Sequence, residues 1–206
     1  NKFYNLGDYI TVNISSPNTE NLRDFHEKKE LTELLKSINE AKKNNNTKVP
    51  IAVKISPDLN FNQIENIAEI LVSNHVEIII ISNSTDGNRD ILSNINKLEK
   101  GGLTGKPIEK ISNKLIKYFY KLVGKKIKII GVGGVDSAKG VYEKIENGAT
   151  LVQLYTGMVY QGPNIAIKIN KDLINILKRE GIKEISELVG TKNWSWRSSN
   201  EILYKL

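Results

Sequence analysis

Short apolar runs alternate along the chain with longer stretches in which apolar residues recur every three or four positions. The short runs predict buried strands, and the helical spacing predicts amphipathic helices. We expect strands over residues 8–14, 50–55, 76–81, 127–132 and 150–154. We expect helices over residues 29–43, from 60 or 62 through 71, over 107–123, 138–147 and 165–177, with a polar insert at 83–106.

The alternation of strand and helix predicts an α/β fold with an all-parallel sheet. A closed (β/α)8 barrel needs eight such units and about 250 residues, whereas this chain has 206 residues and five predicted units. Two architectures therefore remain open: an open doubly wound sheet, or the last five βα units of a barrel whose first three lie upstream. The first residue is Asn1 and not Met, so we expect a fragment or a processed product.

Composition narrows the chemistry. The chain has no Cys, which excludes disulfides, thiolate metal sites and a Cys nucleophile. The two histidines, His26 and His75, lack metal-ligand spacing; we expect them at the surface or at helix ends, and expect no metal site. The net charge is +7, but the lysines are scattered over predicted helical faces. We therefore favour solvated helices over a nucleic-acid interface, while noting that a basic surface also favours anionic lipids or acidic substrates.

Uncharged polar residues follow two predicted strands. Residues 13–19, Asn-Ile-Ser-Ser-Pro-Asn-Thr, follow the first strand, and residues 82–85, Ser-Asn-Ser-Thr, follow the third. Parallel α/β folds build their sites at the carboxyl ends of strands, and these groups suit a planar, amide-rich ligand. The same Ser and Asn residues at 13–19 would also cap a following helix.

Lys54 and two glycine-containing loops point to an anionic cofactor. An unpaired ammonium is costly to bury, so Lys54 within its apolar strand either reaches the sheet edge or meets an anionic partner. Residues 131–134, Gly-Val-Gly-Gly, end the fourth strand, and 155–157, Tyr-Thr-Gly, end the fifth. Tight turns alone would explain either, but the last two βα loops of barrels often bind phosphate. No Walker loop or complete dinucleotide fingerprint is present, and no paired strand-end carboxylates suggest a glycosidase. The set suits a flavin mononucleotide enzyme.

Six motifs then give the chain a family resemblance. They are residues 13–19 with Leu22 and Arg23 after them, 54–59 (Lys-Ile-Ser-Pro-Asp-Leu), 81–85 (Ile-Ser-Asn-Ser-Thr), 101–105 (Gly-Gly-Leu-Thr-Gly), 129–135 (Ile-Ile-Gly-Val-Gly-Gly-Val) followed by Gly148 and Ala149, and 153–157 (Gln-Leu-Tyr-Thr-Gly). In this order they resemble the class 2, quinone-dependent dihydroorotate dehydrogenases, over residues 8 to about 190. The resemblance implies an FMN-binding (β/α)8 TIM barrel, of which residues 1–206 form the C-terminal portion of a single domain. Its first strands and its membrane-binding segment would lie upstream.

The resemblance also implies an activity. Such an enzyme oxidises dihydroorotate to orotate in pyrimidine biosynthesis, with FMN as the hydride acceptor and a ubiquinone-type quinone as the final oxidant. It would be a peripheral protein of the bacterial or mitochondrial inner membrane. Ser16 would be the base that removes the C5 proton, Thr19 its relay, and Lys54 would stabilise the reduced flavin. Class 1 relatives carry Cys where this chain has Ser16.

The remaining site residues follow from the same resemblance. The implied substrate-binding residues are Asn13, Asn18, Asn83 and Ser84, the last standing where Thr is usual. The implied FMN-binding residues are Asn13, Lys54, Ser82, Thr104, Gly105, Gly133, Gly134, Tyr155 and Thr156.

Two other functions stay open at this point. Another FMN barrel oxidoreductase, such as a dihydropyrimidine or dihydrouridine dehydrogenase, should differ around Ser16 and Asn18. A basic nucleic-acid-binding module leaves Lys54 within its strand unexplained. We also expect residues 1–206 alone not to form a stable, active enzyme, because an open barrel exposes sheet edges.

Overall fold

The computed structural model describes residues 6–87, 89–90 and 92–196, and side chains as far as residue 193. Five parallel strands form one sheet in chain order, so that each strand pairs with the next along the sequence. They are β1 (Ile10–Asn13), β2 (Ile51–Ile55), β3 (Ile78–Ile81), β4 (Lys128–Val132) and β5 (Leu151–Gln153). All five predicted strands are confirmed, and each is shorter than the sequence suggested.

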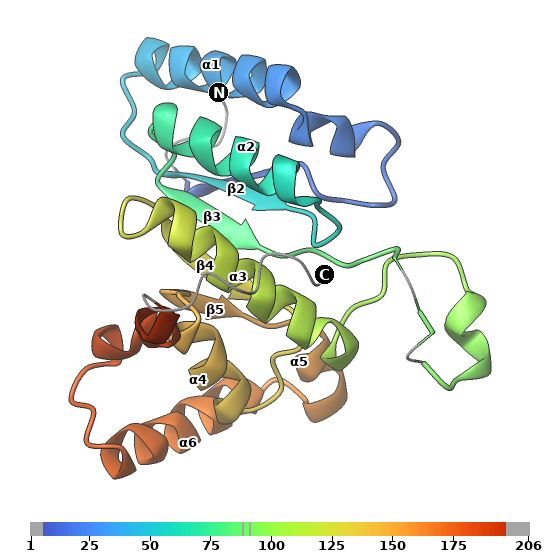
Figure 1. The fold of residues 1–206 in the computed structure, drawn as a ribbon, viewed down its shortest axis with the longest axis vertical. Coiled ribbons are helices and arrows are strands. Elements are labelled where there is room, and N and C mark those ends of the chain that lie inside the picture. The colour runs from blue at the N-terminus through green and yellow to red at the C-terminus, as the bar shows by residue number, and fades with distance from the viewer. Residues whose placement is uncertain (1–5, 88, 91, 197–206) are drawn as a thin grey trace.

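The helices follow the strands along one side of the sheet (Figure 1). They are α1 (Lys28–Asn44), α2 (Phe61–Ser73), α3 (Glu109–Val123), α4 (Ala138–Glu146), α5 (Thr156–Gln161) and α6 (Ile165–Arg179). The 3-10 helices are η1 (Leu22–His26), η2 (Ile95–Leu98), η3 (Lys106–Ile108), η4 (Ile185–Leu188) and η5 (Thr191–Trp196). Asn60, and not Asn62, caps α2: its side chain accepts from Gln63 N while the Gln63 side chain accepts from Asn60 N. Such a reciprocal pair satisfies two backbone donors at the helix start.

The two faces of the sheet differ in what covers them. Side chains alternate between faces along a strand. On the outer face Val53, Ile79 and Ile129 are wholly buried, in one cluster with residues of α1, α2 and α3. On the inner face a small cluster of Ala52, Ile80 and Ile130 contains strand residues only. Sequential strand order with helices on one face is the winding of a barrel, and a doubly wound sheet would need a reversal of strand order.

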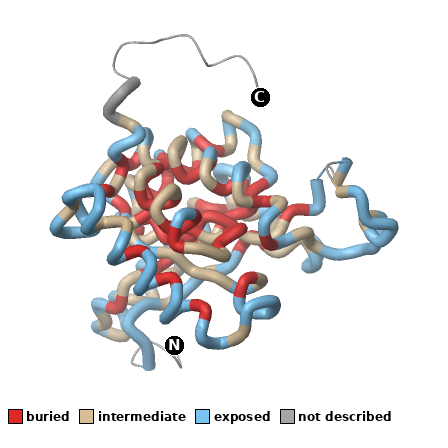
Figure 2. Tube along the Cα trace, turned by 90° about the horizontal axis from the view of Figure 1, so that it is seen from below, coloured by how far each residue is buried: buried red, intermediate tan, exposed pale blue. Residues whose placement is uncertain are grey.

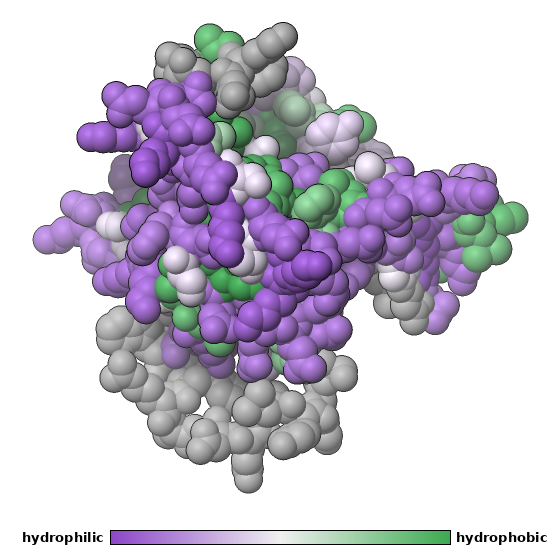
Figure 3. Space-filling model, turned by 90° about the horizontal axis from the view of Figure 1, so that it is seen from above, coloured by the Kyte–Doolittle hydropathy of each residue, from purple (hydrophilic) through white to green (hydrophobic). Residues whose placement is uncertain are grey.

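A long arm leaves the sheet after β3 and returns before α3. A two-residue antiparallel bridge between Thr85 and Leu103 closes its base. Within the arm, the Arg89 guanidinium donates to the carbonyls of Lys97, Glu99 and Gly101. The arm projects away from the helices in Figure 1, and most of it is exposed in Figure 2. Two exposed apolar side chains, Ile95 and Leu98, belong to η2 within the arm. Figure 3 shows a green, hydrophobic patch at the end of the arm.

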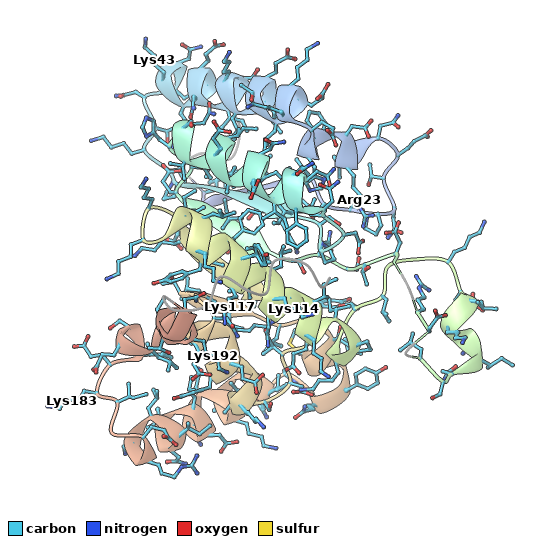
Figure 4. All side chains as sticks on the ribbon, viewed as in Figure 1. Arg23, Lys43, Lys114, Lys117, Lys183 and Lys192 are labelled. Atoms are coloured by element: carbon cyan, nitrogen blue, oxygen red, sulfur yellow. The ribbon has the colours of Figure 1, made fainter. Side chains whose placement is uncertain are left out.

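Many of the basic residues lie on the outside of the molecule. Figure 4 shows Lys43 on α1, Lys114 on α3 and Lys183 beyond α6, each well separated from the other two. All three are exposed. Among the described helices, none is both long enough and apolar enough to cross a membrane.

Candidate active site

A cavity of about 930 Å³ lies at the carboxyl ends of β2 to β5. Its volume is within the range of small-molecule and cofactor sites, roughly 300–1,000 Å³. Most of the predicted site residues line it: Asn18, Lys54, Ser82, Asn83, Ser84, Thr104, Gly105, Gly133, Gly134, Tyr155 and Thr156. Asn13, Ser16 and Thr19 do not. Strand ends that meet at one edge of a parallel sheet bring these separate sequence motifs together.

Lys54 contributes an ammonium group to this cavity. Its Cα pairs in register with Asn13 on one side and with Ile80 on the other. The side chain is half-buried, and desolvation lowers its pKa from the ordinary lysine value. Within the described ranges no carboxylate or other side chain makes a hydrogen bond or ion pair with it. A partly desolvated cation that lines a cavity without a protein partner is suited to an anionic or electron-rich ligand.

A chain of polar side chains connects the end of β1 with the end of β3. Asn13 Oδ1 accepts from Ser15 Oγ at 2.6 Å and from Ser15 N at 3.2 Å. Ser15 Oγ in turn accepts from Asn83 Nδ2 at 2.9 Å, and Asn83 Oδ1 accepts from Ser84 N at 2.8 Å. Two hydrogen bonds therefore link Asn13 to the cavity: Asn13 holds the Ser15 hydroxyl, and Ser15 orients the Asn83 amide that lines the cavity.

The loop after β1 carries Ser16. The side chain is half-buried, and its Oγ accepts from Asn18 N at 3.2 Å. Thr19 is exposed, and in the described structure no hydrogen bond joins its hydroxyl to that of Ser16. The loop nevertheless borders the cavity, because a Cβ placed on Gly102 would lie 3.3 Å from Pro17 Cγ. The roles of Ser16 as base and Thr19 as relay stay predictions.

The glycine-rich loop after β4 is closely packed against α3. Gly133 and Gly134 have φ values of 116° and 76°, which favour glycine. A Cβ on Gly134 would lie 2.8 Å from the Glu109 Cα atom. Since no larger residue fits, the backbone itself forms this wall of the cavity, as it does in phosphate-binding loops.

The last part of the insert, residues 102–105 at the base of the arm, closes another wall. A Cβ on Gly102 would lie 2.6 Å from Ser84 Cβ, so the backbone at Gly102 lies directly against the end of β3. Thr104 Oγ1 and Thr156 Oγ1 are 3.2 Å apart and share a hydrogen bond. The predicted residues after β3, in the insert and after β5 thus form one continuous lining.

Comparison with known proteins identifies the family of the chain. A family model described as Dihydroorotate dehydrogenase matches residues 1–177. The chain belongs to the dihydroorotate dehydrogenase family.

Several relatives in that family are quinone-dependent by name. A dihydroorotate dehydrogenase (quinone) of Bartonella henselae is 41% identical over 187 residues, which cover 89% of this chain and 52% of that protein. A mitochondrial one of Arabidopsis thaliana is 41% identical over 189 residues, covering 89% and 41%. The crystal structure of an Eimeria tenella dihydroorotate dehydrogenase with ferulenol superposes with a TM-score of 0.88 at 28% identity, covering 93% of this chain and 56% of that one. The chain spans about half the length of the curated relatives it matches.

Three loops of the chain are joined by an ionic cluster that the sequence did not reveal. Arg23 of η1 contacts Asp58, after β2, at 3.1 Å and Asp86, at the base of the arm, at 2.7 Å. Figure 4 shows Arg23 pointing toward the base of the arm. Thr85 Oγ1 also donates to Asp58. Desolvation raises the pKa of Asp58, while the hydrogen bond from Arg23 lowers that of Asp86. Arg23 and Asp58 belong to motifs in the sequence, but the fold alone brings them together.

His26 departs in part from its expected position. It is the last residue of η1, but only 2% of it is exposed. Its Nδ1 donates to Arg23 O at 2.9 Å, and its Nε2 accepts from Ser56 N at 3.3 Å. Burial lowers its pKa, which agrees with a neutral ring. His26 therefore fixes the end of the Ser16 loop against β2. Among the described residues, no cluster of three or more His, Asp or Glu is placed to hold a metal.

Proposed function

We propose that the protein is a quinone-dependent dihydroorotate dehydrogenase, which oxidises dihydroorotate to orotate in pyrimidine biosynthesis. The observation that carries this proposal is the cavity itself. In it the Lys54 ammonium, which has no ion-pair or hydrogen-bond partner among the described side chains, meets a pair of neutral amides and a glycine-rich loop from other strand ends. The quinone-dependent names of the relatives support the class of oxidant.

FMN is the cofactor that the cavity fits. Lys54 supplies a partly desolvated positive charge that suits a flavin carrying negative charge, and Gly133 and Gly134 offer a wall without side chains to a phosphate. We assign FMN binding to Lys54 and these glycines together with Ser82, Thr104, Gly105, Tyr155 and Thr156. Asn13, which the resemblance also implied, does not line the cavity, so we assign it no direct contact with the cofactor. When bound, FMN supplies the hydride acceptor and passes the electrons on to the quinone. Lys54 favours the reduced, negatively charged state of the site because its charge is only partly solvated.

Asn18, Asn83 and Ser84 are the proposed substrate contacts. Dihydroorotate presents a carboxylate, two carbonyls and two N–H groups, which amide side chains match in both directions. Asn13 acts through Ser15, which holds the Asn83 amide in one orientation. A site of oriented amides discriminates strongly against a substrate that leaves them unpaired.

Ser16 is the proposed base. A serine hydroxyl is weakly basic at its ordinary pKa, so it must release its own proton as it takes the C5 proton of the substrate. Thr19 is the proposed relay, and its exposed position gives it access to solvent.

Residues 1–206 would supply the last five βα units, that is, the C-terminal portion of a single barrel domain. β1 and β5 are the two edge strands of the sheet, and Leu151, in register with the inward-facing Ile130, is 61% exposed. Gln153 Nε2 donates to Tyr9 OH at 3.2 Å, so the two edges already approach each other across the inner face. We propose that upstream strands pair with both edges and cover this face. A membrane-binding segment before them would attach the enzyme peripherally to a bacterial or mitochondrial inner membrane, where a ubiquinone-type acceptor is dissolved.

Substrate choice tests the proposal. The purified full-length protein should reduce a short-chain ubiquinone when L-dihydroorotate is added, and dihydrouracil or dihydrouridine should not replace it. Quinone reduction driven by dihydrouracil or dihydrouridine, and not by dihydroorotate, would keep the flavin and reject the substrate.

A further inference from the structure

Lys144 of α4 is a buried cation behind the cavity wall. Its exposed fraction is 0%. Its Nζ donates to Ser112 Oγ at 3.0 Å and to Asn113 Oδ1 at 2.9 Å, both on α3. A Cβ placed on Gly131 would lie 3.1 Å from Lys144 Cδ. The lysine stem therefore packs directly against the backbone of β4, just before the glycine-rich loop.

Ser112 passes this contact on to the loop. Its hydroxyl donates to Val132 O at 2.6 Å. The same carbonyl accepts from Ser82 N at 3.1 Å. Val132 and Ser82 both line the cavity, and Gly133 and Gly134 follow Val132 directly. One carbonyl thus joins the buried ammonium to the glycine-rich loop and to the end of β3.

A cation at this position is costly. Burial lowers the pKa of Lys144 to about 8. Its direct partners are neutral, and the nearby carboxylates are Glu109 of α3 and Glu143 of α4, with Lys106 of η3 opposing them. The carboxylate of Glu109 is 3.0 Å from Lys106 Nζ. An apolar residue of similar length would fill the space without this desolvation cost. An anion bound at the adjacent glycine-rich loop would attract the Lys144 ammonium and offset part of this desolvation cost.

We propose that Lys144 is a positioning residue for phosphate recognition, which acts through Ser112 and the Val132 carbonyl to fix the glycine-rich loop and places a positive charge behind it. The inference rests on the proposed function, because FMN supplies the phosphate. Lys144 contacts no cavity ligand itself. Its effect should therefore be confined to the phosphate and should not extend to the flavin ring.

Riboflavin, which is FMN without the phosphate, separates these contributions. We expect the flavin-free, full-length wild-type protein to bind FMN more tightly than riboflavin, as measured by quenching of flavin fluorescence. Lys144→Met should weaken FMN binding about tenfold or more, as for the loss of a hydrogen bond that involves a charge. Riboflavin binding should change less than about twofold, within the variation of a conservative change. Lys139→Met, an exposed lysine on the same helix, is the matched control and should change neither affinity.

The outcomes distinguish a failure of the proposed phosphate site from a failure of the proposed role of Lys144. A wild-type protein with no preference for FMN over riboflavin would reject the phosphate site and this inference with it. A preference that survives intact in Lys144→Met would reject the inference alone, as would an equal loss of both affinities, which indicates a general packing role. If Lys144→Met does not fold, Ser112→Ala carries the test, because it removes one hydroxyl only. It should lower FMN affinity about fivefold and leave riboflavin affinity unchanged; equal effects on both ligands would again reject the inference.

Discussion

The side-chain amide of Asn83 donates to Ser15 Oγ at 2.9 Å and so ties the end of β3 to the loop after β1. Ser15 is wholly buried, whereas Asn83 lines the cavity. The hydroxyl is itself held by Asn13. The amide that faces the proposed substrate is thus oriented by a residue outside the cavity.

Ser15→Ala should raise the KM for dihydroorotate about five- to tenfold, because the Asn83 amide loses the partner that orients it. FMN content should stay at the wild-type level. Steady-state kinetics with a soluble quinone measure the change. Ser37→Ala removes an exposed hydroxyl that bonds only within α1, and it serves as the control. An unchanged KM would show that Asn83 is oriented without Ser15.

Ser16→Ala should slow flavin reduction by dihydroorotate about 10²- to 10⁴-fold, the usual contribution of a positioned base. Stopped-flow absorbance under anaerobic conditions measures this step by itself. FMN should remain bound, because Ser16 is not among the residues assigned to FMN binding. A wild-type rate of reduction in this variant would remove Ser16 from the mechanism.

Lys54→Met should lower both the FMN content of the purified protein and the rate of flavin reduction. The change keeps an unbranched apolar stem and removes the charge, so the electrostatic contribution is lost while the stem still fills the space beside the sheet. The control is Lys128→Met, which changes an exposed lysine at the amino end of β4, opposite the strand end that borders the cavity. Full flavin content with an unchanged rate would show that the Lys54 ammonium only reaches solvent.

Lys144 should give the stability a specific pH dependence. The pKa of Lys144 is about 8 in the folded chain and 10.5 in its ordinary state. Between these values the unfolded chain binds the additional proton, so the free energy of unfolding of the wild type rises with pH relative to that of Lys144→Met. The slope should be about 1.4 kcal/mol per pH unit from pH 8 to 10.5, and flat below pH 8. Urea unfolding of both proteins over pH 7–10 measures it. A constant difference across this range would contradict the lowered pKa.

The strands, and the gathering of the polar motifs at one edge of the sheet, could be predicted from the sequence. Each motif is local, and a parallel sheet necessarily brings the ends of successive strands to one edge. Lys54 was informative because a charge within an apolar strand conflicts with the local pattern.

The contacts between distant segments were not predictable in this way. Arg23 is 63 residues from Asp86 in the sequence, and no local pattern marks them as partners. Lys144 has the spacing of an ordinary helical lysine, and it is buried because α4 packs against α3 and β4. The short helix α5 was missed because exposed Val159 and Tyr160 give it no amphipathic pattern. The shape of the arm depends on Arg89, whose guanidinium donates hydrogen bonds to backbone carbonyls up to 12 residues away.

An anaerobic titration of the full-length protein with L-dihydroorotate tests the central claim most directly. Visible flavin absorption is the observable. We expect bleaching on addition of dihydroorotate and recovery on addition of a soluble quinone, which demonstrates both half-reactions. A yellow protein that stays oxidised in the presence of dihydroorotate would contradict the assigned substrate, and a colourless protein that binds no FMN would contradict the assigned cofactor.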